Sequence, residues 1–254
     1  MDHGWSKGQI MKKLVIVNVG SAPEAQREKF GDFEIWAKNA ITNELPCSDR
    51  QPIEIIFHDG ISSSLPNFDS IAGVIIMGSL SMATEKTNWM LRLSSEISEL
   101  INNKIPLLGI CFGHQLIAQA MGGEVGYHPK GLEIGTVNIN KLSSAENDPL
   151  FSFLPAQFSA HAVHFQSVLT LPKKATLLAN NEFEPHHAFR IGECAWGVQF
   201  HPEFTADIMR FSLTGLKEHV IEEYAEKQAA IFETNCARQV LVKFSQFCMT
   251  KINL

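Results

Sequence analysis

The sequence lacks several patterns that mark common functional classes. Its five cysteines are odd in number and scattered, and no CxxC pair occurs, so neither a disulfide framework nor a zinc ribbon is indicated. No apolar run approaches the length of a membrane span, and the first run, Leu14 to Val19, is too short for a secretory signal. A P-loop, a GxGxxG motif after a strand and an internal repeat are also missing. These absences favour a cytoplasmic protein with reduced thiols, and no membrane partner is expected.

Overall charge and size narrow the class further. A net charge of -6 and a pI near 5.9 argue against nucleic acid as a partner. With 254 residues, of which 45% are hydrophobic, the chain can form one α/β domain with a sizeable core. Residues 1–10 show no periodicity and are expected to be a flexible leader, so a single domain is predicted over residues 11–254. Helical spacing over about 222–248 predicts C-terminal helices at the end of that domain.

Apolar runs that end in turn residues alternate with segments of helical spacing. The runs predict buried strands over residues 12–20, 53–57, 71–77 and 106–110. The helical spacing predicts helices over residues 32–41, 88–101, 116–121 and 205–216. Shorter apolar pieces between residues 125 and 191 predict antiparallel strands. Parallel strands alternating with helices, followed by an antiparallel excursion, are typical of an α/β fold.

The strand at 106–110 leads into Gly109-Ile110-Cys111-Phe112-Gly113, which has the spacing of a nucleophile elbow with Cys in place of Ser. The flanking glycines suit a strained turn in which the following helix passes close to the strand. Such a turn places the thiol at the carboxyl end of the sheet, where the helix N-terminus favours the thiolate. The backbone N–H of Phe112 could then donate to a developing oxyanion. The alternative is a buried structural Cys in a Gly-rich turn.

A second apolar strand ends in His201-Pro202-Glu203. A Cys nucleophile needs a base, and the base needs a carboxylate that orients it. His201 and Glu203 supply both groups at the end of one strand. The alternative is a surface His with a solvated Glu, but the order of Cys followed by His-x-Glu makes a catalytic set the favoured interpretation.

The segments 106–123 and 197–204 together resemble the class I glutamine amidotransferases, which include the amidotransferase domain of guanosine monophosphate synthetase. The resemblance extends over about Leu14 to Met209. Segments 123–135 and 187–192 are similar to the stand-alone branch of the family, which includes γ-glutamyl peptidases. The resemblance implies a flavodoxin-like, three-layer α/β sandwich with a central, mostly parallel sheet. Its site is expected at the carboxyl edge of that sheet.

The resemblance also implies roles for the residues of the elbow and of the His strand. Cys111 would attack a γ-glutamyl amide, His201 would activate the thiol and protonate the leaving amine, and Glu203 would orient His201. One oxyanion donor would be the N–H of Phe112. The other would be the N–H of Gly78 or of Ser79, and the sequence does not choose between them because Leu80 replaces the proline that presets this turn in the family. An ordinary loop is an equal alternative at these two positions.

Substrate-binding roles follow from the resemblance as well. Gln115, one helical turn past Cys111, matches a position whose side chain helps to bind glutamine. The segment Val163, His164 and Phe165 matches a loop whose backbone holds the amino-acid end of glutamine, although Gln166 stands where the family usually has Asp. For Gln115 the alternative is a helix-face side chain that contacts backbone.

Three functions remain open at this level: a glutaminase that passes ammonia to a separate synthetase subunit, a free-standing γ-glutamyl peptidase acting on small γ-glutamyl compounds, and a non-catalytic regulatory module. The sequence shows no synthetase segment after the last helices, which is weak support for the second. A thioester hydrolase of another fold would share the elbow but not the strand-end His-x-Glu. No cofactor and no metal is expected, because His161, His164, His186 and His187 have no further ligand at a recognisable spacing.

Overall fold

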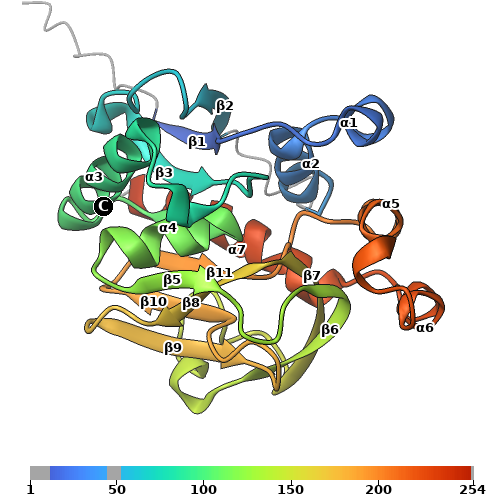
Figure 1. The fold of residues 1–254 in the computed structure, drawn as a ribbon. Coiled ribbons are helices and arrows are strands. Elements are labelled where there is room, and N and C mark those ends of the chain that lie inside the picture. Colours follow the sequence, from blue (N-terminus) through green and yellow to red (C-terminus); the bar gives the residue numbers. More distant parts are fainter. Residues whose placement is uncertain (1–11, 45–52, 253–254) are drawn as a thin grey trace, which may run out of the picture.

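The structure is a computed structural model that describes residues 12–44 and 53–252, so the predicted leader over residues 1–10 lies outside the described residues (Figure 1). A nine-stranded mixed sheet runs through it in the order β2-β1-β3-β4-β11-β10-β9-β6-β7. The first five strands are parallel, and they are β2 (Glu54–Asp59), β1 (Lys13–Asn18), β3 (Ile71–Ile76), β4 (Leu107–Ile110) and β11 (Ala195–Val198). The rest pair antiparallel, and they are β10 (Ala188–Ile191), β9 (Ala175–Asn180), β6 (Glu133–Lys141) and β7 (Gln157–His164). A small second sheet pairs β5 (Glu124–Tyr127) with β8 (Gln166–Thr170).

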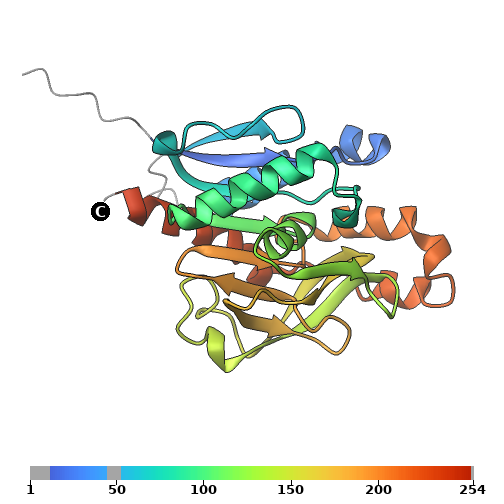
Figure 2. The ribbon, with the colours of Figure 1, turned by 60° about the vertical axis from the view of Figure 1, so that its left-hand side comes forward.

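Seven α-helices lie among the described residues: α1 (Glu24–Phe30), α2 (Phe33–Glu44), α3 (Asn88–Asn102), α4 (Phe112–Ala120), α5 (Ala206–Gly215), α6 (Tyr224–Ala229) and α7 (Asn235–Ile252). In both ribbon views α3 and α4 cover one face of the parallel strands, while α7 crosses the opposite face (Figures 1 and 2). Helix α2 packs with α7 on that face. The predicted three-layer α/β sandwich is therefore confirmed. Within these ranges no helix combines the length and the apolar character needed to cross a membrane.

Alternation along β1 shows how one strand serves two layers. Successive side chains of a strand point to opposite faces. Leu14 and Ile16 accordingly belong to the core beneath α2 and α7, whereas Val15 and Val17 belong to the core beneath α3 and α4. All four are fully buried. A continuous apolar run is what a strand covered on both faces requires, and it explains why the sequence carries no polar alternation here.

Two helices depart from the sequence-based prediction. Helix α4 begins at Phe112, four residues before the predicted start, because the turn consumes only Cys111 and the N–H of Gln115 already bonds the carbonyl of Cys111 at 3.1 Å. Helix α1 was not predicted, because residues 24–30 are mostly polar. The sequence did carry start and stop signals for this helix, because Pro23 precedes its first turn and Gly31 (φ 81°) follows its last.

The tail contains α6 and α7, separated by residues 230–234. Ile231 in this linker is buried, and its carbonyl accepts a hydrogen bond from Arg210 Nη2 at 2.9 Å. Glu233 accepts from the N–H of Ala206 at 3.0 Å and so satisfies a free donor at the start of α5. The linker therefore fixes α5, which borders the cavity described below.

Candidate active site

Cys111 occupies a strained turn between β4 and α4. Its backbone has φ 50° and ψ -100°, a positive-φ conformation outside the left-handed helical region that non-glycine residues seldom adopt. The two flanking glycines are required by space. A Cβ on Gly109 would lie 2.4 Å from the Gly113 carbonyl, and a Cβ on Gly113 would lie 2.3 Å from the carbonyl oxygen of Ile76. The structure therefore confirms the predicted close approach of helix and strand at this turn.

The electrostatic setting of Cys111 favours negative charge. Cys111 is the N-cap of α4, and its thiol makes no capping hydrogen bond but lies 3.7 Å from the carbonyl oxygen of Val163. The first N–H groups of a helix have no partner inside the helix, and the positive end of the helix dipole lies there. Anionic sulfur or a nearby oxyanion would be stabilised at this position.

His201 and Glu203 form a buried pair just beyond β11. His201 Nδ1 lies 2.8 Å from Glu203 Oε1, and both residues are at most 5% exposed. The backbone N–H of His201 donates to the carbonyl of His161 at 2.8 Å, and its ring stacks on Phe204 with centroids 4.2 Å apart. These contacts fix the ring. The second ring nitrogen, Nε2, is buried and has no hydrogen-bond partner among the described residues.

Charge keeps His201 protonated at neutral pH. Burial by itself lowers the pKa of His201, but the negative charge of Glu203 and the interactions with Cys111 outweigh it and raise that pKa to about 10. The neighbouring His161 behaves in the opposite way. Burial and the charge of His201 lower the pKa of His161 to about 3, so His161 is neutral and does not compete for the proton.

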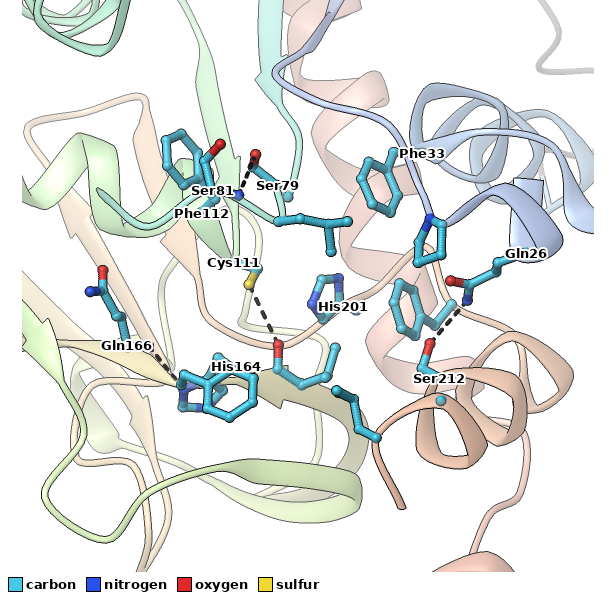
Figure 3. Close-up of a pocket in the computed structure, with 18 of the residues that line it drawn as sticks. Gln26, Phe33, Ser79, Ser81, Cys111, Phe112, His164, Gln166, His201 and Ser212 are labelled. Carbon is cyan, nitrogen blue, oxygen red and sulfur yellow. Dashed lines mark hydrogen bonds between the residues drawn. The ribbon is translucent and has the colours of Figure 1, made fainter. Parts of the chain in front are cut away.

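The turn after β3 faces these two residues. A Cβ on Gly78 would lie 3.3 Å from the His201 ring and 3.8 Å from Cβ of Cys111, so the backbone of Gly78 closes the site on this side. The side chain of Ser79 points elsewhere, because its Oγ donates to the carbonyl of Val19 at 2.7 Å and accepts from the N–H of Ser81 at 3.1 Å (Figure 3). Ser79 can therefore offer the site only its backbone.

The segment from Val163 to Gln166 forms the opposite wall, at the end of β7 and the start of β8. Sγ of Cys111 lies 3.7 Å from the carbonyl oxygen of Val163. The side-chain amide of Gln115 donates to the carbonyl of Gln166 at 2.6 Å and to Oε1 of Gln199 at 3.1 Å. Gln166 itself bonds Thr84 Oγ1 at 2.7 Å, so the residue that replaces the family's Asp ties this wall to the loop before α3.

One cavity of about 360 Å³ brings the predicted site residues together. It is lined by the predicted nucleophile, base, oxyanion and substrate residues, namely Cys111, His201, Gly78, Ser79, Phe112, Gln115, Val163, His164 and Phe165. Glu203 does not line it and lies behind His201. The cavity also reaches Gln26 of α1, Phe33 of α2 and Ser212 of α5, which the sequence did not suggest (Figure 3).

A second buried ionic group, also missed from the sequence, supports the Val163–Gln166 wall. Glu133 Oε2 lies 2.8 Å from His164 Nε2 and 3.3 Å from His187 Nε2, and Glu133 Oε1 accepts from Asn181 Nδ2 at 2.8 Å. His164 Nδ1 lies 3.1 Å from the carbonyl of Gln166. Burial by itself raises the pKa of Glu133, but the hydrogen bond with His164 and the close contact with His187 lower it well below its usual range. A charged Glu133 thus anchors His164 from behind.

Comparison with known proteins identifies the family. The sequence profile of the family "Glutamine amidotransferase class-I" matches residues 47–213. γ-Glutamyl peptidase 3 of Arabidopsis thaliana is 32% identical over 184 residues, which cover 69% of this chain and 73% of the relative. A glutamine-hydrolysing GMP synthase subunit of Pyrococcus furiosus is 43% identical over 112 residues, which cover 42% of this chain and 57% of the relative.

Solved structures give the same fold. The crystal structure of a glutamine amidotransferase from Thermotoga maritima superposes with a TM-score of 0.70 at 20% identity, covering 94% of this chain and 98% of that one. The chain therefore belongs to the class I glutamine amidotransferase family. Membership indicates an enzyme of the glutamine amidotransferase or γ-glutamyl hydrolase type.

The buried Glu133 group gives a stability prediction. Glu133→Ala leaves buried His164 and the Asn181 amide without their acceptor and His187 without its charged neighbour, and breaking such a group typically costs about 3–5 kcal/mol. Denaturant unfolding should show a loss of free energy of that size. Glu193→Ala is the matched control, because Glu193 pairs with Lys104 at 3.4 Å while both side chains are more than two thirds exposed, so no measurable loss is expected. Equal midpoints for the two variants would show that Glu133 does not anchor this wall.

Proposed function

We propose that this protein hydrolyses a γ-glutamyl amide through a thioester on Cys111. The observation that carries the proposal is the meeting of a strained, helix-capping Cys with a buried His201–Glu203 pair in one cavity. The thiolate attacks the amide carbonyl, and the N–H of Phe112 together with that of Gly78 or Ser79 stabilises the oxyanion. His201 protonates the leaving nitrogen as the C–N bond breaks. Water then attacks the thioester, with His201 accepting its proton, and glutamate leaves.

Binding of the glutamyl moiety is assigned to the side of the cavity formed by the Val163–Gln166 wall. The backbone of Val163, His164 and Phe165 would hold the amino and carboxylate groups of the glutamyl moiety. Gln115 fixes this wall rather than reaching for substrate through its amide nitrogen, since that nitrogen already donates to Gln166 and Gln199. The Glu133–His164 contact holds the same wall from the rear.

We further propose that the isolated chain is active without a synthetase, as the name of the peptidase relative suggests for that protein. A second candidate is a glutaminase that depends on a separate synthetase subunit. The Pyrococcus relative is named as a subunit of GMP synthase, and Leu80 at the rim of the cavity is 62% exposed, where a partner could contact the oxyanion turn. The two candidates share the same hydrolytic reaction. They differ in whether a synthetase subunit must bind before that reaction proceeds.

Cys111 is the first point to test. Cys111→Ala and Cys111→Ser are expected to abolish hydrolysis of glutamine and of γ-glutamyl peptides by the purified chain, because the thiolate forms the bond to substrate. Peptide mapping after a glutamine-mimicking chloroketone should locate the adduct on Cys111. Cys236→Ser, at an exposed position outside the cavity, is the control and should retain full activity. An adduct on Cys47 or Cys194 with Cys111 free would refute the assignment. Labelling of Cys111 without turnover of any substrate would favour the partner-dependent glutaminase.

The raised pKa of His201 gives a pH prediction. A base whose pKa rises to about 10 on folding keeps its proton through neutral pH, and loses it as the pH rises through that value. Activity should therefore fall on the alkaline side only as the pH approaches 10. Glu203→Gln removes the negative charge that lies beside His201 Nδ1. The alkaline limb of the variant's pH–activity curve should therefore move to lower pH by about one unit or more on the same substrate. Superimposable limbs for wild type and variant would mean that another group carries the proton.

A further inference from the structure

The cavity extends well past the reacting atoms. Its volume of about 360 Å³ lies within the range that holds drug-sized ligands. An ammonia leaving group needs space for one heavy atom. In Figure 3 the side chains of Gln26, Phe33 and Ser212 lie on the far side of His201 from Gln166. The part of the cavity beyond His201 would therefore stay unfilled if the substrate were a glutamyl group that releases only ammonia.

The chemistry of the reaction says which part of a substrate would enter that space. His201 must reach the nitrogen that leaves, so the leaving amine lies on the side of His201. The glutamyl moiety lies toward Gln115 and the Val163–Gln166 wall. This orientation rests on the proposed function. The region beyond His201 is then the binding site of the leaving amine, and we refer to it as the amine pocket. We assign to it Phe204, whose ring stacks on His201, and the cavity-lining residues on or next to α1, α2 and α5, namely Pro23, Gln26, Phe33, Phe211, Ser212, Gly215 and Leu216.

The amine pocket is mostly apolar, and His201 at its border is the one charged side chain beside it among the cavity-lining residues. Three phenylalanines and a leucine supply its side walls, and the ring of Phe204 is held between His201 and Trp36, at centroid distances of 4.2 and 5.5 Å. Its two polar side chains bond each other, since Gln26 Nε2 donates to Ser212 Oγ at 3.0 Å, and Gln26 Nε2 also lies 3.5 Å from the carbonyl oxygen of Ile208. No Lys, Arg, Asp or Glu is among the residues that line the cavity. An ionised group placed beyond His201 would lose its hydration without an ion-pairing partner among the residues of the amine pocket.

We propose that the preferred substrates are γ-glutamyl amides of a large, uncharged, apolar amine, such as an aromatic or branched alkyl amine. The C–N bond of such an amide breaks as the thioester to Cys111 forms, and the amine leaves with the proton from His201. A γ-glutamyl amino acid of the same size is a poorer substrate, because the free carboxylate of its leaving group meets the apolar wall. Glutamine is also poorer, because it leaves the amine pocket empty and gains nothing from burying apolar surface.

A panel of four amides tests this directly on the purified chain. The probes are γ-glutamyl benzylamide, γ-glutamyl phenylalanine, γ-glutamyl methylamide and glutamine, with glutamate release as the readout. The expected kcat/KM for the benzylamide exceeds each of the others by about tenfold or more, the scale on which an apolar pocket discriminates by size. Equal or higher values for glutamine or for γ-glutamyl phenylalanine overturn the inference while leaving the proposed hydrolase intact. Failure of all four, with Cys111 unreactive, overturns the proposed function as well.

Moving a positive charge into the amine pocket should change this preference. Leu216→Arg supplies the missing cation, so the ratio of kcat/KM for γ-glutamyl phenylalanine over that for the benzylamide should rise about tenfold relative to wild type. Thr214→Arg is the matched control, because Thr214 lies in the preceding helix α5, is exposed and does not line the cavity. Its ratio should equal that of wild type. Equal ratios for both variants, with glutamate release from γ-glutamyl methylamide retained as proof of folding, would contradict the assignment of the leaving amine to this region.

Discussion

The strained, positive-φ backbone of Cys111 is the constraint on which the site depends. It lets β4 end and α4 begin within one residue, which places the thiol at the carboxyl edge of the sheet and at a helix N-terminus at once. The same turn is possible only because Gly113 lets α4 approach the carbonyl of Ile76 and because Gly109 leaves space for Gly113. The surrounding structure holds this residue in its strained conformation, because β3 and β11 pair with β4 on either side.

Two buried ionic groups complete the arrangement, and they lie on different walls. The His201–Glu203 pair lies just beyond the end of β11, beside Cys111. It holds the proton that the proposed reaction transfers. The Glu133 group lies behind His164 and fixes the wall to which the glutamyl end is assigned. Buried charges of this kind are costly unless each is paired and hydrogen-bonded. Their presence on both sides of one cavity is the physical reason for placing the chemistry there.

Local patterns made the strands and the elbow predictable, because a strand buried on both faces is apolar throughout and the elbow spacing is set by a single turn of backbone. The catalytic roles of Cys111, His201 and Glu203 stay a proposal, although the structure brings these residues to one edge of the sheet. Long-range contacts were the part that the sequence did not reveal. Glu133 of β6 meets His164 of β7 and His187, which immediately precedes β10, so no local spacing signals the group. Helix α1 was missed because only Gln26 of it is buried, against α5 at the end of the amine pocket.

The central claim is that Cys111 carries the glutamyl group between two half-reactions. The most direct measurement is rapid acid quenching of the wild-type chain during turnover of a γ-glutamyl amide, followed by intact mass and peptide analysis. The account predicts an added mass of one glutamyl group, located on Cys111, removed by neutral hydroxylamine and absent from the Cys111→Ala variant. Amide turnover with the glutamyl adduct on a different residue, or turnover retained by the Cys111→Ala variant, would contradict it.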